Sequence, residues 1–186
     1  MTPITQLNAL RAHRTPVDER EAAAWDEVAT FLQTPPADSD TVHITAAGIV
    51  VSERGVMLLQ HKRLGIWVQP GGHIEANEAP HRAALRESRE ETGLAIRHPA
   101  GGPRLIHIDA HDGGRGHRHY DFRYLLKGLG TTPRPPHGES QQVRWCTPDE
   151  AIGLADDGLV GLFRACPTNP INTFTTHLYS LSVPIT

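Results

Sequence analysis

Residues 86–94 read RESREETGL and place Glu87, Glu90 and Glu91 within one turn of a predicted helix. Residues three and four apart are neighbours on a helix, and each like-charged pair at that spacing loses roughly 0.2–0.5 kcal/mol. A chain tolerates this loss when a positive group lies among the carboxylates, or when arginines separate them on a solvated face. The flanking residues must decide between these two cases.

The predicted helix, residues 79–92, has an acidic, a basic and a packing face. On a wheel of 100° per residue, the three glutamates share an arc of about 100° beside a narrow face able to lie close to a sheet. Taken alone, this is most simply a solvated helix with i,i+4 ion pairs such as Glu78–Arg82. The packing face comprises Ala84, Leu85, Ser88 and Thr92, and the basic face comprises Arg82, Arg86 and Arg89.

The residues upstream favour a cation among the carboxylates. Pro70-Gly71-Gly72 predicts a tight loop directly after a short strand, residues 66–69, and Gly93 is expected to end the helix. Glycine lets the backbone approach an ion or a phosphate and leaves a carbonyl oxygen available as a ligand. Carboxylate, carbonyl and water oxygens are the ligands that Mg²⁺ and Mn²⁺ prefer.

The composition predicts an ordinary soluble globular protein of the cytoplasm. A net charge of −3 over 186 residues gives no electrostatic footprint for long nucleic acid or an anionic membrane. The longest apolar run, residues 46–51, is far shorter than the ~20 residues of a membrane span, and the N-terminus does not read as a signal peptide. Cys146 and Cys166 have no metal or redox spacing, so we expect free thiols.

The chain divides into three predicted parts. Residues 1–40 form an N-terminal helical extension and linker, with a helix capped by Thr15 that runs to about Gln33, followed by TPPADSD at 34–40. Residues 41–165 form the main domain, and residues 166–186 form a C-terminal tail without trusted periodicity. Irregular alternation of strands and helices predicts an α/β sandwich with a mixed sheet. Strands are expected at 43–51, 56–62 (a hairpin with the first), 66–69, 104–110, 119–126 and 143–146, and short helices from 147 and over 159–164.

Residues 72–94, GHIEANEAPHRAALRESREETGL, resemble the Nudix box, G-x5-E-x7-R-E-U-x-E-E-x-G-U, where U is a bulky aliphatic residue. Ser88 departs from the pattern at an aliphatic position, and we expect it to weaken helix–sheet packing rather than activity. Asn77 stands where many members carry glycine, and asparagine tolerates a left-handed backbone. Every fixed letter matches in register, with Leu94 as the final U: Gly72, Glu78, Arg86, Glu87, Glu90, Glu91 and Gly93.

The resemblance covers roughly residues 41–165 and implies a Nudix-type α/β/α sandwich. It also implies a metal-dependent pyrophosphohydrolase that cleaves NDP-X to NMP and a phosphorylated X by attack of water on phosphorus. The implied ligands of Mg²⁺ or Mn²⁺ are Glu87, Glu90, Glu91 and the carbonyl of Gly71. Arg86 would orient a carboxylate, and Glu78 would tie the loop of Gly72 to the helix that Gly93 ends.

The general base and the substrate contacts are less determined. In this family the base is a box glutamate or a later loop glutamate, so Glu90 and Glu139 are both candidates. Trp67 and His119 are predicted to contact substrate. Tyr120, Phe122 and Tyr124 alternate on one strand face and are expected in the core. The histidines around residues 107–119 match no standard zinc spacing.

Three alternatives stay open beside hydrolysis of a small nucleotide diphosphate derivative. A non-catalytic Nudix module would sense nucleotides or bind a partner, but such modules usually lose box carboxylates. A prenyl diphosphate isomerase needs a Cys–Glu pairing that the sequence lacks. A capped-RNA hydrolase is disfavoured by the acidic balance. The particular substrate is not predicted, and a homodimer is possible.

Overall fold

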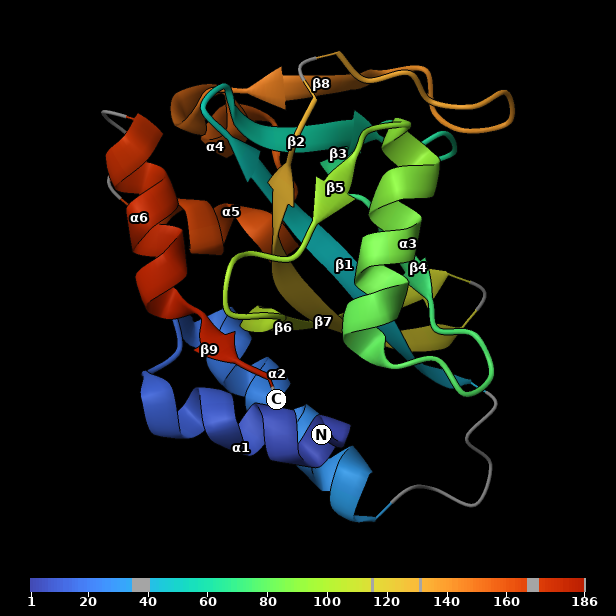
Figure 1. Cartoon of the computed structure of the whole chain (residues 1–186). Helices are drawn as coiled ribbons and strands as arrows, with labels where there is room; N and C mark the ends of the chain where they lie inside the picture. The colour runs from blue at the N-terminus through green and yellow to red at the C-terminus, as the bar shows by residue number, and fades with distance from the viewer. Residues whose placement is uncertain (35–40, 115, 131, 167–170, 186) are drawn as a thin grey trace.

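One mixed sheet organises the residues that the computed structural model describes, which are 1–34, 41–114, 116–130, 132–166 and 171–185. Within them the sheet has nine strands, and its main path runs β3-β2-β1-β7-β6-β9, with β4 paired to β1, β5 to β7 and β8 to β2 (Figure 1). β1 and β7 are parallel, and the other pairs are antiparallel. The strands are β1 (Val42–Ser52), β2 (Gly55–Gln60), β3 (Trp67–Val68), β4 (Gly71–His73), β5 (Ile96–Arg97), β6 (Arg104–Gly114), β7 (His117–Gly128), β8 (Val143–Cys146) and β9 (Val183–Pro184).

Helices cover both faces of this sheet, which confirms the predicted α/β/α sandwich with an N-terminal helical segment. One hydrophobic cluster joins α1, α2 and α3 to one face, and a second cluster joins α4, α5 and α6 to the other. No described helix has the length and hydropathy that crossing a bilayer requires. The helices are α1 (Pro3–His13), α2 (Glu19–Gln33), α3 (Pro80–Thr92), α4 (Pro148–Leu154), α5 (Asp157–Arg164) and α6 (Ile171–Leu181).

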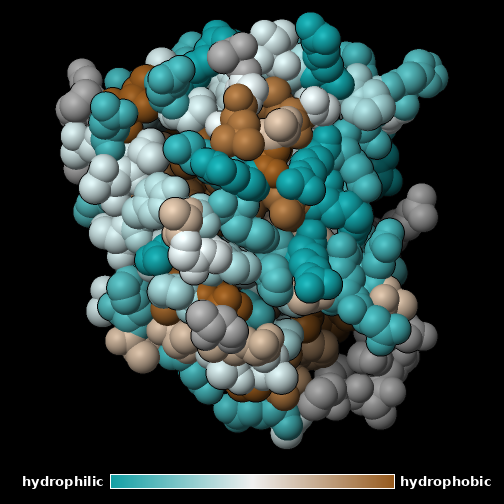
Figure 2. All heavy atoms as spheres, in the orientation of Figure 1, coloured by the Kyte–Doolittle hydropathy of each residue, from teal (hydrophilic) through white to brown (hydrophobic). Residues whose placement is uncertain are grey.

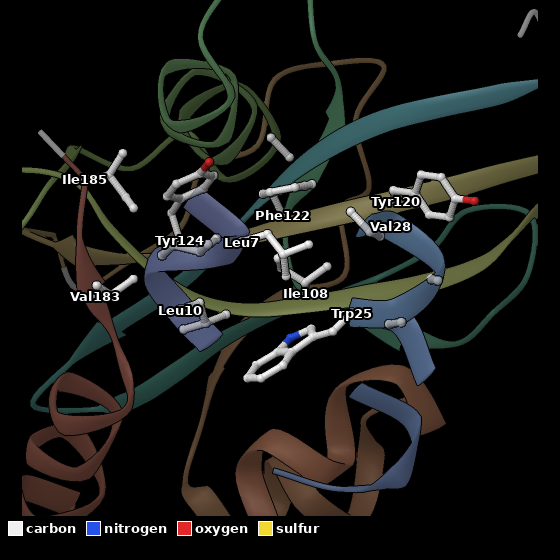
Figure 3. Packing of buried hydrophobic residues seen from close by; sticks show 14 of the residues in the cluster. Leu7, Leu10, Trp25, Val28, Ile108, Tyr120, Phe122, Tyr124, Val183 and Ile185 are labelled. Carbon is white, nitrogen blue, oxygen red and sulfur yellow. The ribbon is translucent and has the colours of Figure 1, made fainter. Parts of the chain in front are cut away.

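The first cluster buries the aromatic side of β7. Tyr120, Phe122 and Tyr124 point to the same face of the sheet and pack against Leu7 of α1 and Val28 of α2 (Figure 3). This confirms the prediction that the alternating aromatic residues belong to the core. The N-terminal helices therefore share the hydrophobic core of the main domain.

Several elements differ from the sequence expectations. α1 was not predicted, and α2 begins at Glu19 because the Asp18 carboxylate, not Thr15, accepts from the Glu21 amide at 2.8 Å. The expected hairpin pairs β1 with β2 over two residue pairs, and β2 pairs more extensively with β8. The predicted linker lies mostly outside the described residues, which resume at 41.

The expected tail contains ordered structure. After the gap at 167–170, α6 packs its Phe174 and Leu178 into the second cluster, and β9 pairs with the start of β6. The first and last helices also meet, because His13 contacts the Ser180 carbonyl at 2.8 Å and Arg14 donates to the Leu181 carbonyl at 3.1 Å. β-Branched and polar residues here gain their structure from tertiary contacts, which local periodicity does not reveal.

The face seen in Figure 2 is mostly hydrophilic, with a hydrophobic patch near β5 between α6 and α3. Leu129, which is half exposed, directly follows β7, and its amide donates to the Ala95 carbonyl at 2.8 Å. Such patches of modest size are common on monomeric proteins, so we attach no function to it.

Candidate metal and active site

The acidic helix α3 is fixed at both ends by backbone geometry. Pro80 occupies its first turn, and Gly93 ends it in a left-handed conformation with φ of 64°. A Cβ atom built at Gly93 would lie 1.9 Å from the Arg134 carbonyl oxygen, so only glycine fits there. Asn77 in the preceding loop also has φ of 64°, as its side-chain type led us to expect.

Helix α3 lies unusually close to the sheet. Ser88 is fully buried, donates to the Ala84 carbonyl at 2.6 Å, and faces Gly48 of β1. A Cβ atom at Gly48 would lie 2.2 Å from the Ser88 hydroxyl oxygen. The departure from an aliphatic residue is thus matched by a glycine on the opposing strand, and the packing that we expected to be weakened is close.

Arg86 is the centre of the carboxylate cluster. Its guanidinium donates to both oxygens of Glu78 (3.0 and 2.8 Å), to Glu87 (2.7 Å) and to Glu90 (3.1 Å). It also donates to the His73 carbonyl at 3.1 Å, which ties α3 to β4. These contacts lower the pKa of Glu78 and raise the pKa of Arg86, so both groups are held in their charged forms.

Glu91 occupies a different environment from its neighbours. It lies behind the double glycine, where its carboxylate accepts from the Gly71 amide at 2.8 Å. Burial, with smaller contributions from the charges of Glu87 and Glu139, raises the pKa of Glu91 to about 7, although the amide hydrogen bond opposes the shift. The site therefore has a carboxyl group that changes charge near neutral pH.

Gly72 allows the acidic helix face to approach β4. A Cβ atom at Gly72 would lie 2.8 Å from the carboxylate of Glu87. A side chain at this position would displace the Glu87 carboxylate, so glycine allows that carboxylate to lie directly against the β4 backbone. Strand β4 and the acidic face of α3 thus meet at the double glycine.

Glu139 lies close enough to Glu91 for its charge to raise the pKa of Glu91. Both line a cavity of about 210 Å³, together with Leu59, His61, Lys62, Arg63 and Ser140. The structure thus brings together two predicted site residues that are 48 positions apart in the chain. The sequence reasoning missed His61, Lys62 and Ser140, and the basic run HKR before the third predicted strand is the signal that could have identified the first two.

The two predicted substrate contacts, Trp67 and His119, do not line this cavity. Trp67 packs against the second cluster, and the Arg144 guanidinium lies 5.0 Å from its ring centroid. His119 lies in a cross-strand row with His43 and His111, and burial lowers its pKa to about 4. His73, next to Gly72, has its ring centroid 5.1 Å from that of His119, so the row approaches the carboxylate loop.

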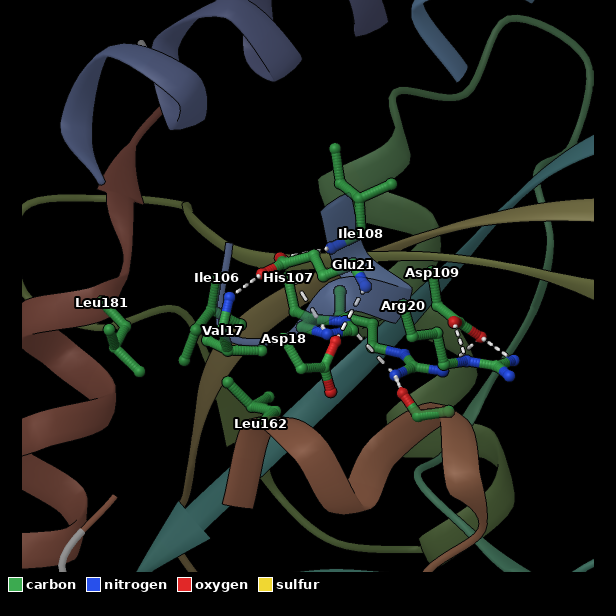
Figure 4. A network of polar contacts seen from close by, with 12 residues as sticks. Val17, Asp18, Arg20, Glu21, Ile106, His107, Ile108, Asp109, Leu162 and Leu181 are labelled. Atoms are coloured by element: carbon green, nitrogen blue, oxygen red, sulfur yellow. Dashed lines mark hydrogen bonds and ion pairs between the residues drawn. The ribbon is translucent and has the colours of Figure 1, made fainter. Parts of the chain in front are cut away.

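A second charged network fills the space between α2, α5 and the sheet (Figure 4). Arg123 is almost completely buried, donates to Asp121 at 2.9 Å and Asp109 at 3.3 Å, and also donates to the Gly158 carbonyl. Arg20 of α2 donates to Asp109 at 2.7 Å. Asp121 further accepts from Gln69 at 3.0 Å, directly before the Pro70-Gly71-Gly72 loop.

Buried Glu21 continues this network along β6. It accepts from Arg14 at 2.6 and 2.7 Å and from the backbone amides of Val17 and Ile108. Arg14 also donates to the Ile106 carbonyl at 2.7 Å. Neighbouring His107 is fully buried, and burial lowers its pKa to about 4, so it is neutral near pH 7.

The residues of α3 suit a hard divalent cation by their donor chemistry. Three carboxylates and the backbone of the double glycine supply only oxygen ligands. Among the residues that the structure describes, no three His, Cys, Asp or Glu side chains are already grouped around one ion position. Glu87 and Glu90 each accept from Arg86 through one oxygen, so a cation would bind through the remaining lone pairs of their carboxylates.

Comparison with known proteins agrees with this geometry. The family model described as NUDIX domain matches residues 42–165. The chain is 29% identical over 149 residues to "Putative 8-oxo-dGTP diphosphatase 3" of Mycobacterium tuberculosis, covering 64% of this chain and 68% of the relative. It is 32% identical over 119 residues to "Isopentenyl-diphosphate Delta-isomerase" of Streptomyces griseus, covering 59% of each.

The fold also matches solved structures. The MutT NUDIX hydrolase of Burkholderia pseudomallei superposes with a TM-score of 0.56 at 22% identity, over 66% of this chain and 97% of that protein. At this identity the match concerns the fold, and it includes nearly all of the smaller protein. The family match begins at the first residue of β1 and therefore excludes α1 and α2.

Proposed function

This chain belongs to the Nudix family of pyrophosphohydrolases, and we propose that it cleaves NDP-X to NMP and a phosphorylated X with Mg²⁺ or Mn²⁺ as cofactor. The observation that carries this proposal is the position of Glu91. Its carboxylate lies behind Gly71, on the acidic face of α3, and across a cavity from Glu139. An acid so placed can serve both the cation and the reacting water.

The chain's own residues would hold the cation and the diphosphate in place. Glu87, Glu90, Glu91 and the Gly71 carbonyl would bind the cation, which when bound neutralises the diphosphate and lowers the pKa of water. Ionisation of Glu91 near neutral pH would accompany this binding. Arg86 keeps Glu87 and Glu90 oriented, and the Glu78–Arg86 pair ties α3 to the loop before it.

Two glutamates can accept the proton of the attacking water. Glu139 is half-buried on a loop and lines the cavity, whereas Glu90 is 56% exposed and contacts Arg86. The position of Glu139 opposite Glu91 favours it, because a base must reach the water that the site holds. Glu139→Gln should lower kcat and remove the acidic limb of its pH profile, whereas a structural Glu139 would leave that limb in place.

A product screen tests the proposal directly. Purified protein is incubated with nucleotide sugars, ADP-ribose, NADH, dinucleotides and nucleoside triphosphates with Mg²⁺ or Mn²⁺, and products are identified by mass spectrometry in ¹⁸O-water. Incorporation of ¹⁸O into NMP or the other phosphorylated product would show attack of water on phosphorus. Glu91→Gln should lower turnover by at least about 10²-fold.

The matched control is Glu53→Gln, which makes the same change on the exposed turn between β1 and β2. It should retain full turnover. Turnover that survives Glu91→Gln, or absence of turnover with binding of nucleotide, would support the non-catalytic module instead. Calorimetric titration that shows no Mg²⁺ or Mn²⁺ binding in the presence of nucleotide would contradict the cofactor assignment.

The structure gives no support to the isomerase alternative. Both cysteines are buried in the second hydrophobic cluster, which lies on the sheet face opposite α3. Burial raises the pKa of Cys146 and raises that of Cys166 to about 12, so neither thiol is poised for proton transfer. Free thiols are consistent with the predicted cytoplasmic location, and the homodimer stays a prediction.

A further inference from the structure

Three consecutive basic residues line the cavity beside Glu91 and Glu139. His61, Lys62 and Arg63 follow β2 in a tightly held turn. The His61 ring nitrogen Nδ1 accepts from the amides of Arg63 (3.3 Å) and Leu64 (3.2 Å), and the Gln60 side chain donates to the Gly65 carbonyl at 2.8 Å. The basic turn, residues 61–65, is therefore ordered by its own hydrogen bonds.

The basic turn is joined to the loop that carries Glu139. Lys62 donates its ammonium to the Gly138 carbonyl, next to Glu139. Ser140 donates its hydroxyl to the Gln60 carbonyl at 2.7 Å, and the Gln60 amide donates to the Gln142 carbonyl at 2.9 Å. The two walls of the cavity are thus held together, with the cations on one wall and Glu139 on the other.

The size of this cavity limits what can enter it. Its volume of about 210 Å³ is below the roughly 300–1,000 Å³ of sites that enclose drug-sized ligands. A nucleoside does not fit within it, whereas a phosphate group does. Lys62 and Arg63 are exposed, so an anion can reach them from solvent.

The charges of the cavity also favour an anion. Without a metal ion, Lys62 and Arg63 line the same cavity as Glu91 and Glu139, so the formal charges of these four side chains balance when both glutamates are ionised. Once Glu91 binds a divalent cation, the positive charges are in excess. Burial, with smaller contributions from the charges of Arg63 and Lys62, lowers the pKa of His61, so the positive charge of the basic turn is that of Lys62 and Arg63. A phosphate in the cavity would form charge-assisted hydrogen bonds with these two side chains.

We propose that the basic turn binds a phosphate beyond the cleaved linkage, so that the preferred substrate carries a chain of three or more phosphates rather than a diphosphate-linked sugar. This inference rests on the proposed function and specifies its substrate class. Lys62 and Arg63 would act as specificity residues, because they distinguish substrates by the charge of the group attached to the NMP.

Paired substrates of the same base test the inference. We compare kcat/KM for ATP against ADP-ribose and for GTP against GDP-mannose in the wild type and in Lys62→Gln/Arg63→Gln. The double variant should lose about 10- to 100-fold in kcat/KM for the triphosphates, mainly through KM, and less than about threefold for the sugars. An equal loss for both classes, or none for either, would overturn the proposal.

The chain offers a control with the same change of charge. Arg97 of β5 and Lys127 of β7 are exposed cross-strand partners, and Arg97→Gln/Lys127→Gln removes one arginine and one lysine elsewhere. This variant should keep the wild-type preference. Because Lys62 also contacts the loop of Glu139, Arg63→Gln alone must show part of the selective loss, and Lys62→Arg should retain the preference.

Binding of inorganic tripolyphosphate separates the two proposals. Calorimetry with Mg²⁺ should show tripolyphosphate binding that is weakened about 10-fold or more in the Lys62→Gln/Arg63→Gln variant and unchanged in the control. If no substrate is hydrolysed but this selective loss occurs, the proposed function fails and the phosphate subsite stands. If nucleotides are hydrolysed but tripolyphosphate binds both proteins equally, the subsite is refuted and the hydrolase stands.

Discussion

The two charged networks of this protein are organised around an arginine each, but their charge balance differs. In the cluster on and beside α3, Arg86 contacts Glu78, Glu87 and Glu90. Glu91 lies against the Gly71 amide instead, so four glutamates and one arginine leave three formal negative charges when all are ionised. On the opposite face, Arg20 and Arg123 balance Asp109 and Asp121, and Arg14 balances Glu21. The first network can accept a cation, whereas the second already contains its own.

The balanced network is also more deeply buried than the network around Arg86. Arg123 and Asp109 are only 2% and 1% exposed, whereas Arg86 and Glu90 are 24% and 56% exposed. Burying an unpaired charge costs much free energy, so the buried charges must be paired. A partly exposed carboxylate keeps its contact with water and can stay without a cation until a ligand binds. The difference teaches that excess charge at a protein surface, rather than the number of ion pairs, marks the functional cluster.

The largest expected effect comes from breaking the balanced network. Asp109→Ala leaves Arg20 without a carboxylate and leaves Arg123 with Asp121 alone, and it should lower the free energy of unfolding by about 3–5 kcal/mol, measured by urea denaturation. The control is Asp112→Ala. Because Asp112 is 89% exposed in its pair with Arg118, this substitution should lower the free energy of unfolding by less than about 1 kcal/mol. Equal effects at the two sites would mean that burial does not separate these networks.

Breaking the unbalanced network should affect catalysis more than stability. Arg86→Gln frees Glu87 and Glu90 from their common donor and should lower kcat by about 10- to 100-fold, with the unfolding free energy changed by less than about 2 kcal/mol. Arg82→Gln, on an exposed position of the same helix, should leave kcat unchanged. A loss of stability without loss of kcat would mean that Arg86 supports the fold and does not position the catalytic carboxylates.

The contact between the two layers can be tested at Gly48. Gly48→Ala should destabilise the fold by about 1–3 kcal/mol, because its Cβ atom would collide with the Ser88 hydroxyl and with Leu126. Gly48→Ala/Ser88→Ala removes the closer of these collisions and should recover part of the loss in thermal denaturation. Strict additivity of the two substitutions would contradict the close packing of α3 on β1.

A further expected effect is a dependence of stability on pH, and it has opposite sign in the two networks. Glu91 is raised to a pKa of about 7, so between pH 4.5 and 7 the folded state holds more protons and metal-free stability should fall as pH rises. His107 is lowered to about 4, so it should make stability rise between pH 4 and 6.5. Denaturation of Glu91→Gln and His107→Gln should show that each substitution removes its own slope, and unchanged slopes would contradict this assignment.

The sequence predicted one network well and the other hardly at all, for a physical reason. The glutamates of α3 are neighbours through helical spacing, so their meeting is local and readable. The meeting of Glu21 with Ile108, or of Glu91 with Glu139, depends on how distant segments pack. The order of predicted strands and helices along the chain was enough to predict the mixed sheet and its longer strands. The elements that are short or weakly patterned depend on contacts with their neighbours, and these are α1, α6, β4, β5 and β9.

The pairing of Arg14 with Glu21 has a consequence for self-association. β6 has β7 on one side, and on its other side β9 pairs only with Arg104 and Leu105. Beyond them, Arg14 occupies the Ile106 carbonyl and Glu21 occupies the Ile108 amide, so side chains of the N-terminal segment stand where another strand would bind. Without that segment, β6 would offer an open edge for pairing with a second molecule, and aggregation would follow. The N-terminal extension, which lies outside the family match, thus blocks this part of the β6 edge from pairing with a second molecule of the protein.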